Sequence, residues 1–283
     1  MFFRERLHFS AFFCSAKASS LLLATLAAGL VGCTSETPPP PDQPAKVVIN
    51  PSTKEERERT EEEFRVVAEI QEAGGAVTQD GADALVTLGG DQLTEEQFEK
   101  IVYLNEFQKV TVIYVDSDKL TDSTIATFAK MTELERIQIG SPAITDAGFA
   151  HLSGLLRLHS LDVDAPQLTD AALGHLSGLT EMRRMGLTNT KITGSGLVHL
   201  AGLTKLNSIA LDNAPVTDEG LRYLAQLPEL RDLDLRGTKV TDAGLLVLRD
   251  HPTLTTIVVR GSQVTPAGAQ ALRNANSRFR VFQ

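Results

Sequence analysis

Three histidines, His151, His175 and His199, recur with a 24-residue period, and a stack of imidazoles is a pattern that can bind a metal ion. Metal–imidazole bonds are about 2.0–2.1 Å long, so the ligands must nearly touch. Neighbouring helices, however, pack about 8–10 Å apart. Tyr223 and Val247 take the same position in later repeats. We therefore interpret the histidines as a copied surface position, and we expect no metal site and no cofactor.

A Thr-Asp pair also recurs, and carboxylates at a fixed spacing can bind calcium. The aspartates of these pairs are Asp122, Asp146, Asp170, Asp218 and Asp242. The ligand spacing of a calcium-binding loop is absent. A threonine at the N-cap of a helix, with an aspartate in the first turn near the positive end of the helix dipole, accounts for the pattern. We interpret the pairs as the beginnings of short helices.

Nucleophilic and acid–base chemistry has few candidates. The cysteines are Cys14 and Cys33, so the rest of the chain has no thiol for a disulfide, a zinc site or a covalent mechanism. Gly194-Ser195-Gly196 lacks the residues that flank a hydrolase nucleophile. The sequence has neither HExxH nor a phosphate-binding glycine loop. We predict that the protein is not an enzyme, with a hydrolase that uses paired carboxylates as a remote alternative.

The elements that must position these residues repeat with the same 24-residue period. Each unit contains an LxxLxL frame, and one further apolar residue precedes each Thr of the Thr-Asp series. The frames begin at Leu134, Leu158, Met182, Leu206, Leu230 and Leu254, and the further residues are Leu120, Ile144, Leu168, Ile192, Val216, Val240 and Val264. A fixed period in this range indicates units that stack, because none can bury its apolar face alone.

Each unit is expected to hold a strand, a turn, a short helix and a second turn. The last two apolar residues of LxxLxL alternate with polar ones, which is typical of a strand with one buried face. Thr145 and its equivalents are expected to cap the helices. Gly154, Gly178 and Gly202 are placed to end them with left-handed C-caps.

The repeated frame over residues 93–283 resembles the leucine-rich-repeat family. The resemblance implies an α/β solenoid with a parallel β-sheet on the concave side and short helices on the convex side. Regular units begin at residue 120, and residues 58–92, with helical spacing followed by short apolar runs, are predicted to form an N-terminal helix/strand cap. The family often places Asn or Cys three residues after the last strand leucine. Here that position holds Pro142, Pro166, Thr190, Ala214, Thr238 and Ser262, so no continuous side-chain ladder is expected there.

Polar residues that alternate with the buried strand residues would line the concave sheet. The candidates for binding are Tyr114, Asp116, Arg136, Gln138, Asp162, Asp164, Arg184, Asp212, Asp232, Asp234, Arg236 and Arg260. Asp116, Asp164 and Asp212 fall in one column, which Arg236 and Arg260 continue with the opposite charge. One interpretation is a binding face for a ligand that is basic at one end and acidic at the other. The alternative is a strand face that is polar only because it meets solvent.

Residues 1–32 have the order of a secretory signal peptide, with basic residues before an uncharged apolar run over 18–32. Leu30-Val31-Gly32-Cys33 resembles the lipobox of bacterial lipoproteins. That resemblance implies cleavage before Cys33 and a lipid, including acyl chains such as palmitate, on the new N-terminal cysteine. An uncleaved N-terminal anchor is the alternative. Residues 33–57 include four consecutive prolines and are expected to form a semi-rigid linker.

Charge restricts the partners. The net charge is −9, and it becomes −11 when residues 1–32, with three Lys/Arg and one Glu, are removed. An acidic surface argues against nucleic acid as a partner. We predict a monomeric, membrane-anchored scaffold that binds an unknown protein or peptide in the bacterial cell envelope. Because Thr34 follows Cys33, we expect the outer membrane, facing the periplasm or the exterior. A spacer or crosslinker of the envelope without a specific ligand is the alternative.

Overall fold

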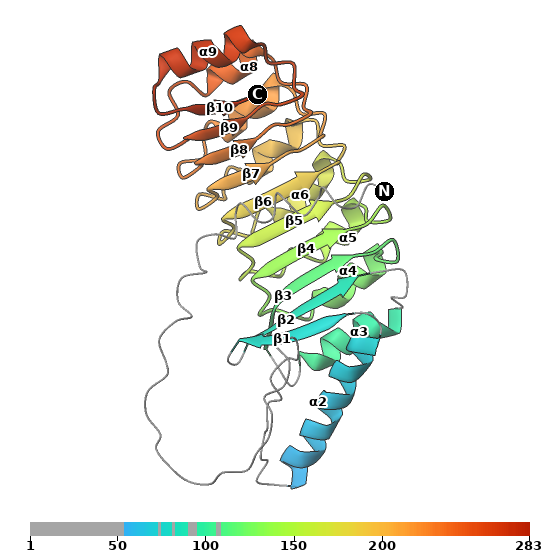
Figure 1. The fold of residues 1–283 in the computed structure, drawn as a ribbon. Helices are drawn as coiled ribbons and strands as arrows, with labels where there is room; N and C mark the ends of the chain where they lie inside the picture. The colour runs from blue at the N-terminus through green and yellow to red at the C-terminus, as the bar shows by residue number, and fades with distance from the viewer. Residues whose placement is uncertain (1–53, 73–74, 81–82, 90–94, 106–108) are drawn as a thin grey trace, which may run out of the picture. The chain divides into compact units, whose positions relative to one another are not determined.

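The computed structural model describes residues 54–72, 75–80, 83–89, 95–105 and 109–283. The predicted signal peptide, Cys33 and the proline-rich linker up to residue 53 lie outside these described residues. Within the described ranges, ten strands form one sheet in chain order from β1 to β10, and short helices lie along one face of this sheet (Figure 1). No helix in these ranges has the length and apolarity that a membrane span requires.

The strands and helices alternate along most of the chain. The strands are β1 (Ala76–Asp80), β2 (Asp83–Gly89), β3 (Lys109–Asp116), β4 (Arg136–Gly140), β5 (Ser160–Asp164), β6 (Arg184–Thr188), β7 (Ser208–Ala210), β8 (Asp232–Asp234), β9 (Thr256–Val258) and β10 (Arg280–Phe282). The helices are α2 (Lys54–Glu72), α3 (Glu95–Leu104), α4 (Asp122–Phe128), α5 (Asp146–Ala150), α6 (Asp170–Leu176), the 3₁₀ helix η1 (Ser195–Leu200), α7 (Asp218–Leu224), α8 (Asp242–Val247) and α9 (Pro266–Ala275).

The register of the sheet follows the 24-residue period. From β4 onward each strand residue lies opposite the residue 24 positions later, so that Ile137 faces Leu161 and Leu161 faces Met185. These side chains point into a continuous core, where Leu134 and Leu158 are fully buried. The predicted α/β solenoid is therefore confirmed, and the LxxLxL frame is the part of each unit that enters the core.

The N-terminal part closes the first end of the stack. Strand β1 is antiparallel to β2, whereas β2 and all later strands pair in parallel. Helix α2 buries Val66 and Ile70 and contacts both α3 and β1. This helix-and-strand arrangement covers the apolar face that the first parallel repeat would otherwise expose to water.

The Thr-Asp pairs join neighbouring repeats, a role that helix capping alone does not include. Asp146 accepts a hydrogen bond from the backbone N–H of Thr169 at 2.8 Å and another from its hydroxyl at 2.6 Å. The Thr169 hydroxyl in turn accepts from the N–H of Ala171 at the beginning of α6. The same bonds join Asp122 to Thr145, Asp218 to Thr241 and Asp242 to Thr265. Each aspartate therefore fixes the helix N-cap of the next unit.

The ladder changes at Gly194, which stands where most other units have aspartate. Asp170 still accepts from the Thr193 hydroxyl and also from the Ser195 hydroxyl. Burial alone would raise the pKa of Asp170, but these bonds and those from two backbone N–H groups lower it. In the next unit, where the N–H of Thr217 would otherwise donate to an aspartate at position 194, it donates to the backbone carbonyl of Thr193. The element that begins here is the 3₁₀ helix η1, whose N-cap Gly194 has a φ of 116°.

The prediction of left-handed C-caps at Gly154, Gly178 and Gly202 is wrong. The helices before these glycines end earlier, at right-handed residues such as His151 and Ser177. The chain then continues in tight i→i+3 turns, for example from the N–H of Leu155 to the carbonyl of Leu152. Apart from Gly194, the left-handed residues in the described ranges lie shortly after the strands, in a row that consists of Asn189, Asn213, Gly237 and Gly261.

The Asp–Thr bonds predict a measurable loss of stability. Replacing Asp146 by alanine removes the acceptor of both Thr169 groups, and we expect the free energy of unfolding to fall by about 1–3 kcal/mol. Urea unfolding followed by circular dichroism measures this change. Asp250→Ala is the matched control, because the Asp250 side chain is 85% exposed and is expected to contribute less than about 0.5 kcal/mol. Equal effects of the two substitutions would show that the ladder does not stabilise the stack.

Candidate functional site

The outward positions of the strands form three rows across the solvent side of the sheet, which we call the sheet face, and most of these positions are polar. The start row is Arg136, Ser160, Arg184, Ser208, Asp232 and Thr256; the middle row is Gln138, Asp162, Gly186, Ala210, Asp234 and Val258; and the end row is Gly140, Asp164, Thr188, Asp212, Arg236 and Arg260. On β3, Tyr114 extends the middle row and Asp116 the end row. The predicted binding candidates all lie in these rows, at right angles to the strands.

Accessibility differs among the candidates. Arg136, Gln138 and Asp162 are exposed, as are Asp116 and Arg260. Tyr114, Asp164, Arg184, Asp212, Asp232 and Arg236 are half-buried. Asp234 is buried, with only 8% of its surface accessible. The expectation that Asp234 is an accessible contact residue is therefore corrected.

Asp234 is buried because it shares one guanidinium with Asp212. Nε of Arg236 lies 2.7 Å from Oδ1 of Asp212 and 3.0 Å from the Asp234 carboxylate. Nη2 of Arg236 donates to Oδ2 of Asp212 at 2.9 Å. Burial and the neighbouring charge of Asp234 raise the pKa of Asp212 to about 6, against the opposing effect of Arg236. Two carboxylates that share one guanidinium therefore link the end row to the middle row at β8.

A short side-chain ladder continues the end row toward the N-terminus. Nδ2 of Asn189 donates to Asp164 at 2.8 Å, and Nδ2 of Asn213 donates to Oδ1 of Asn189 at 3.0 Å. These asparagines stand one residue before the position at which the family places its ladder. The backbone of this turn is paired as well, because the N–H of Asn189 donates to the carbonyl of Asp212 and that of Asn213 to the carbonyl of Arg236.

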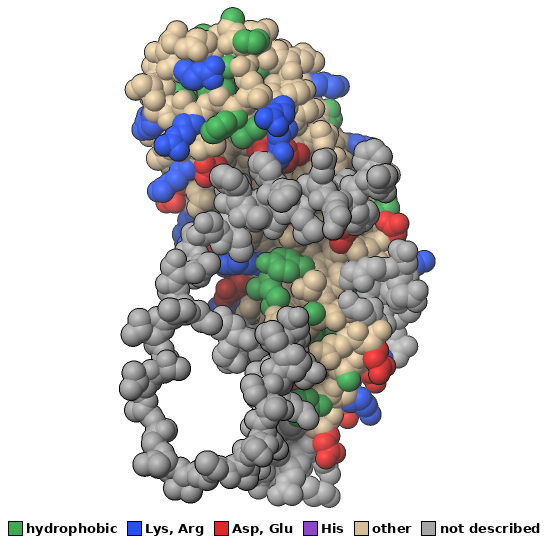
Figure 2. All heavy atoms as spheres, viewed as in Figure 1, with side chains coloured by type: hydrophobic (Ala, Val, Ile, Leu, Met, Phe, Trp, Pro, Cys, Tyr) green, Lys and Arg blue, Asp and Glu red, His purple; other side chains and the backbone are tan. Residues whose placement is uncertain are grey.

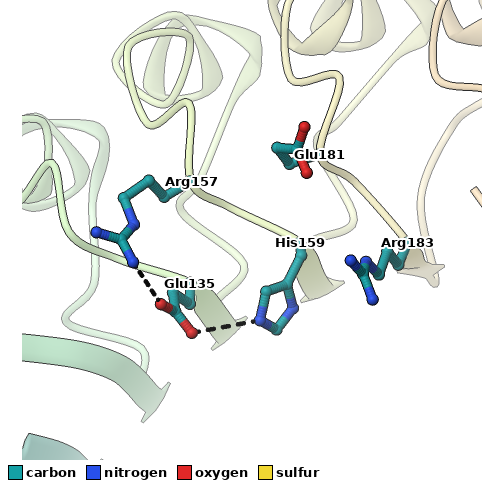
Figure 3. Close-up of a pocket in the computed structure, with 5 residues that line it drawn as sticks. All are labelled: Glu135, Arg157, His159, Glu181 and Arg183. Carbon is teal, nitrogen blue, oxygen red and sulfur yellow. Dashed lines mark hydrogen bonds and ion pairs between the residues drawn. The ribbon is translucent and has the colours of Figure 1, made fainter. Parts of the chain in front are cut away.

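A hollow lies where the turns enter strands β4 to β6, and Glu135, Arg157, His159, Glu181 and Arg183 line it (Figure 3). Arg157 donates to Glu135 at 3.0 Å, and the imidazole of His159 lies 3.5 Å from the same carboxylate. Burial lowers the pKa of His159, and Arg136 and Arg183 add to this effect, while Glu135 opposes it. The alternation of the strands does not predict the hollow, because these residues precede the alternating part of each strand.

Two residues that line the hollow, Arg157 and Glu181, belong to a column of charged residues that can be recognised in the sequence. Glu133, Arg157, Glu181 and Lys205 follow one another with the 24-residue period and alternate in sign. Arg157 pairs with Glu133 at 2.6 Å, and Lys205 pairs with Glu181 at 2.6 Å. The alternation with the repeat period is the signal from which these cross-repeat ion pairs could have been predicted.

Charge also changes along the solenoid. Residues 251–283 contain four arginines and neither Asp nor Glu. Figure 2 shows Lys and Arg side chains gathered around this C-terminal end. Among the described residues, no group of three or more His, Cys, Asp or Glu side chains is arranged to hold a metal ion.

Comparison with known proteins identifies the repeat. A family model described as "Leucine Rich repeat" matches residues 226–248. This segment holds the frame Leu230, Leu233 and Leu235, which recurs in the other units with the 24-residue period and forms the same strand in each. The repeats are leucine-rich repeats.

The leucine-rich-repeat domain also has a similar solved structure. Internalin C2 from Listeria monocytogenes is 20% identical, with a TM-score of 0.45, over 77% of this chain and 91% of that chain. A comparison with curated proteins found no match. Leucine-rich repeats are scaffolds for protein–protein interaction and are typically not enzymes.

The Asp212 cluster predicts a pH dependence with a definite sign. A carboxyl whose pKa is raised in the folded state stabilises the protein while it is protonated. For Asp212 this contribution is complete below the ordinary pKa of 3.8 and is lost as the pH rises through the folded pKa of about 6. Wild type should therefore lose stability relative to Asp212→Asn over this window, as measured by urea unfolding at each pH. Carbon NMR of the Asp212 carboxyl should show titration near pH 6. Titration near pH 4 would contradict the raised pKa.

Proposed function

We propose that the protein is a membrane-anchored scaffold that binds a protein or peptide of the bacterial cell envelope through the sheet face of its leucine-rich repeats. The observation that carries this proposal is the sheet face itself, where three rows of mostly polar and charged residues cross the strands. Such a surface fits an extended or flat partner, because the side chains of each row recur at the strand spacing of about 4.8 Å.

The rigidity of the sheet face supports a binding role. The rows stand on strands in continuous register, and Asp–Thr bonds join most units to the next. A surface that is ordered before binding loses little conformational entropy when a partner arrives. We expect acidic residues such as Asp116, Asp162 and Asp232 to contact basic groups of the partner.

Anchoring through Cys33 is the second part of the proposal. The lipobox-like sequence before Cys33 supports lipid attachment, and several acyl chains would hold the chain at a membrane. The outer membrane is the proposed location, with the protein acting there as a monomer. The alternative is a structural lipoprotein that spaces or crosslinks envelope layers, for which the sheet face would not matter.

The sheet face is tested by charge reversal. In a crosslinking pull-down from intact envelopes, Asp116→Lys/Asp162→Lys/Asp232→Lys should lose a partner that wild type captures, because three carboxylates of one surface become repulsive to its basic groups. We omit Asp234 because it is buried in the Arg236 cluster, where a lysine would also disturb folding.

The matched control is Glu72→Lys/Glu219→Lys/Asp250→Lys, which changes the net charge equally at exposed positions away from the sheet face. The control should retain the partner. Recovery of the same partner by both triple variants would reject the sheet face and favour the structural alternative.

The lipid anchor is tested at Cys33. Cys33→Ser removes the thiol that would carry the lipid, so we expect the protein to leave the membrane fraction and to incorporate no labelled palmitate. Cys14→Ser is the control, because Cys14 lies within the predicted signal peptide and should not affect acylation. Unchanged membrane association and labelling of Cys33→Ser would contradict lipidation at this residue.

A further inference from the structure

Arg183 lines the hollow and Arg136 lies beside it. Arg136 is the first residue of β4, and Arg183 directly precedes β6. Both are exposed. Neither guanidinium has a hydrogen bond or ion pair among the described residues, although the charge of Arg183 helps to lower the pKa of Glu181. His159 lies on the repeat between them, and both arginines act on it electrostatically. Unpaired arginines on either side of an imidazole are suited to binding an anion.

The carboxylates that line the hollow are already compensated. Glu135 is held by Arg157 and His159, and Nζ of Lys205 donates to both oxygens of Glu181 at 2.6 and 2.7 Å. An approaching anion therefore meets carboxylates that already have ion-pair partners and two guanidiniums that form no hydrogen bond or ion pair in the described residues. The two glutamates and two arginines that line the hollow cancel in charge, and Arg136 beside it adds one positive charge, whereas the chain as a whole has a net charge of −9.

Chain geometry indicates the kind of anion that fits. Strands in a sheet are about 4.8 Å apart, so the backbones of Arg136 and Arg183, two strands apart and offset by one residue, are separated by about 10 Å. An extended peptide covers about 10 Å in three residues. Two carboxylate side chains that are two or three residues apart in a partner segment can therefore each reach one guanidinium.

We propose that the hollow binds the side-chain carboxylates of an acidic, extended segment of a partner protein, with Arg136 and Arg183 each taking one carboxylate and His159 between them. This inference rests on the proposed function and specifies the chemistry of the partner at one edge of the sheet face. Each arginine can bind a carboxylate through two parallel hydrogen bonds. The neutral imidazole that the lowered pKa of His159 favours adds one N–H donor.

The probe is a fluorescein-labelled octaglutamate with a blocked C-terminus, so that it offers side-chain carboxylates alone. Fluorescence anisotropy with the purified protein at low ionic strength should show binding despite the acidic net charge of the protein. Arg136→Glu/Arg183→Glu should weaken this binding at least about tenfold, because two charge-assisted contacts are lost. Both residues are exposed, and circular dichroism should confirm that the variant is folded.

The control is Lys130→Glu/Arg222→Glu, which makes the same change in net charge at exposed positions on the helix side. Its binding of octaglutamate should stay within about twofold of wild type. Equal weakening in both variants would show non-specific attraction, and no binding by wild type would remove the site; either result overturns the proposal. Capture of an envelope partner that depends on Asp116, Asp162 and Asp232 would still stand, so failure here is distinct from failure of the proposed function.

Discussion

In-register stacking of the 24-residue units determines what every residue of the solenoid can do. Each unit has too little apolar surface to fold alone, so its LxxLxL side chains must lie directly over those of its neighbours. Once Ile137, Leu161 and Met185 share a column in the core, every other repeat position is also forced into a column. Polar positions then become rows on the sheet face, and charged turn positions become ladders of ion pairs.

The columns serve two purposes that differ in chemistry. On the helix side, carboxylates such as Asp146 are fully used by hydrogen bonds to the next unit and hold the stack together. On the sheet face, Asp212 of the end row and Asp234 of the middle row both accept hydrogen bonds from Arg236. At the hollow, in contrast, Arg136 and Arg183 form no hydrogen bond or ion pair in the described residues. Surface groups that stability does not use are the ones that can serve recognition.

Periodicity predicted the columns but not the bonds between them. The alternation around Ile137 and Ile139 shows directly which side chains enter the core, so the sheet and its rows follow from the sequence. The Asp–Thr pairs were predicted as caps within one helix, because a bond between residues 23 positions apart depends on how closely two units stack. Gly154 was expected to be left-handed, but the chain continues after the helix in tight i→i+3 turns of right-handed residues, so no left-handed residue is required at this position. The burial of Asp234 depends on the side-chain conformation of Arg236, which alternation does not contain.

The central claim, that the sheet face is the surface that meets the partner, is tested most directly by site-specific photo-crosslinking in intact cells. A photoreactive phenylalanine analogue is placed at Tyr114 or Gln138 on the sheet face, or at Arg222 on the helix side. We predict a crosslinked partner band from the sheet-face positions and none from position 222. A band from position 222 with none from the sheet face would contradict the claim and move the binding surface to the helices.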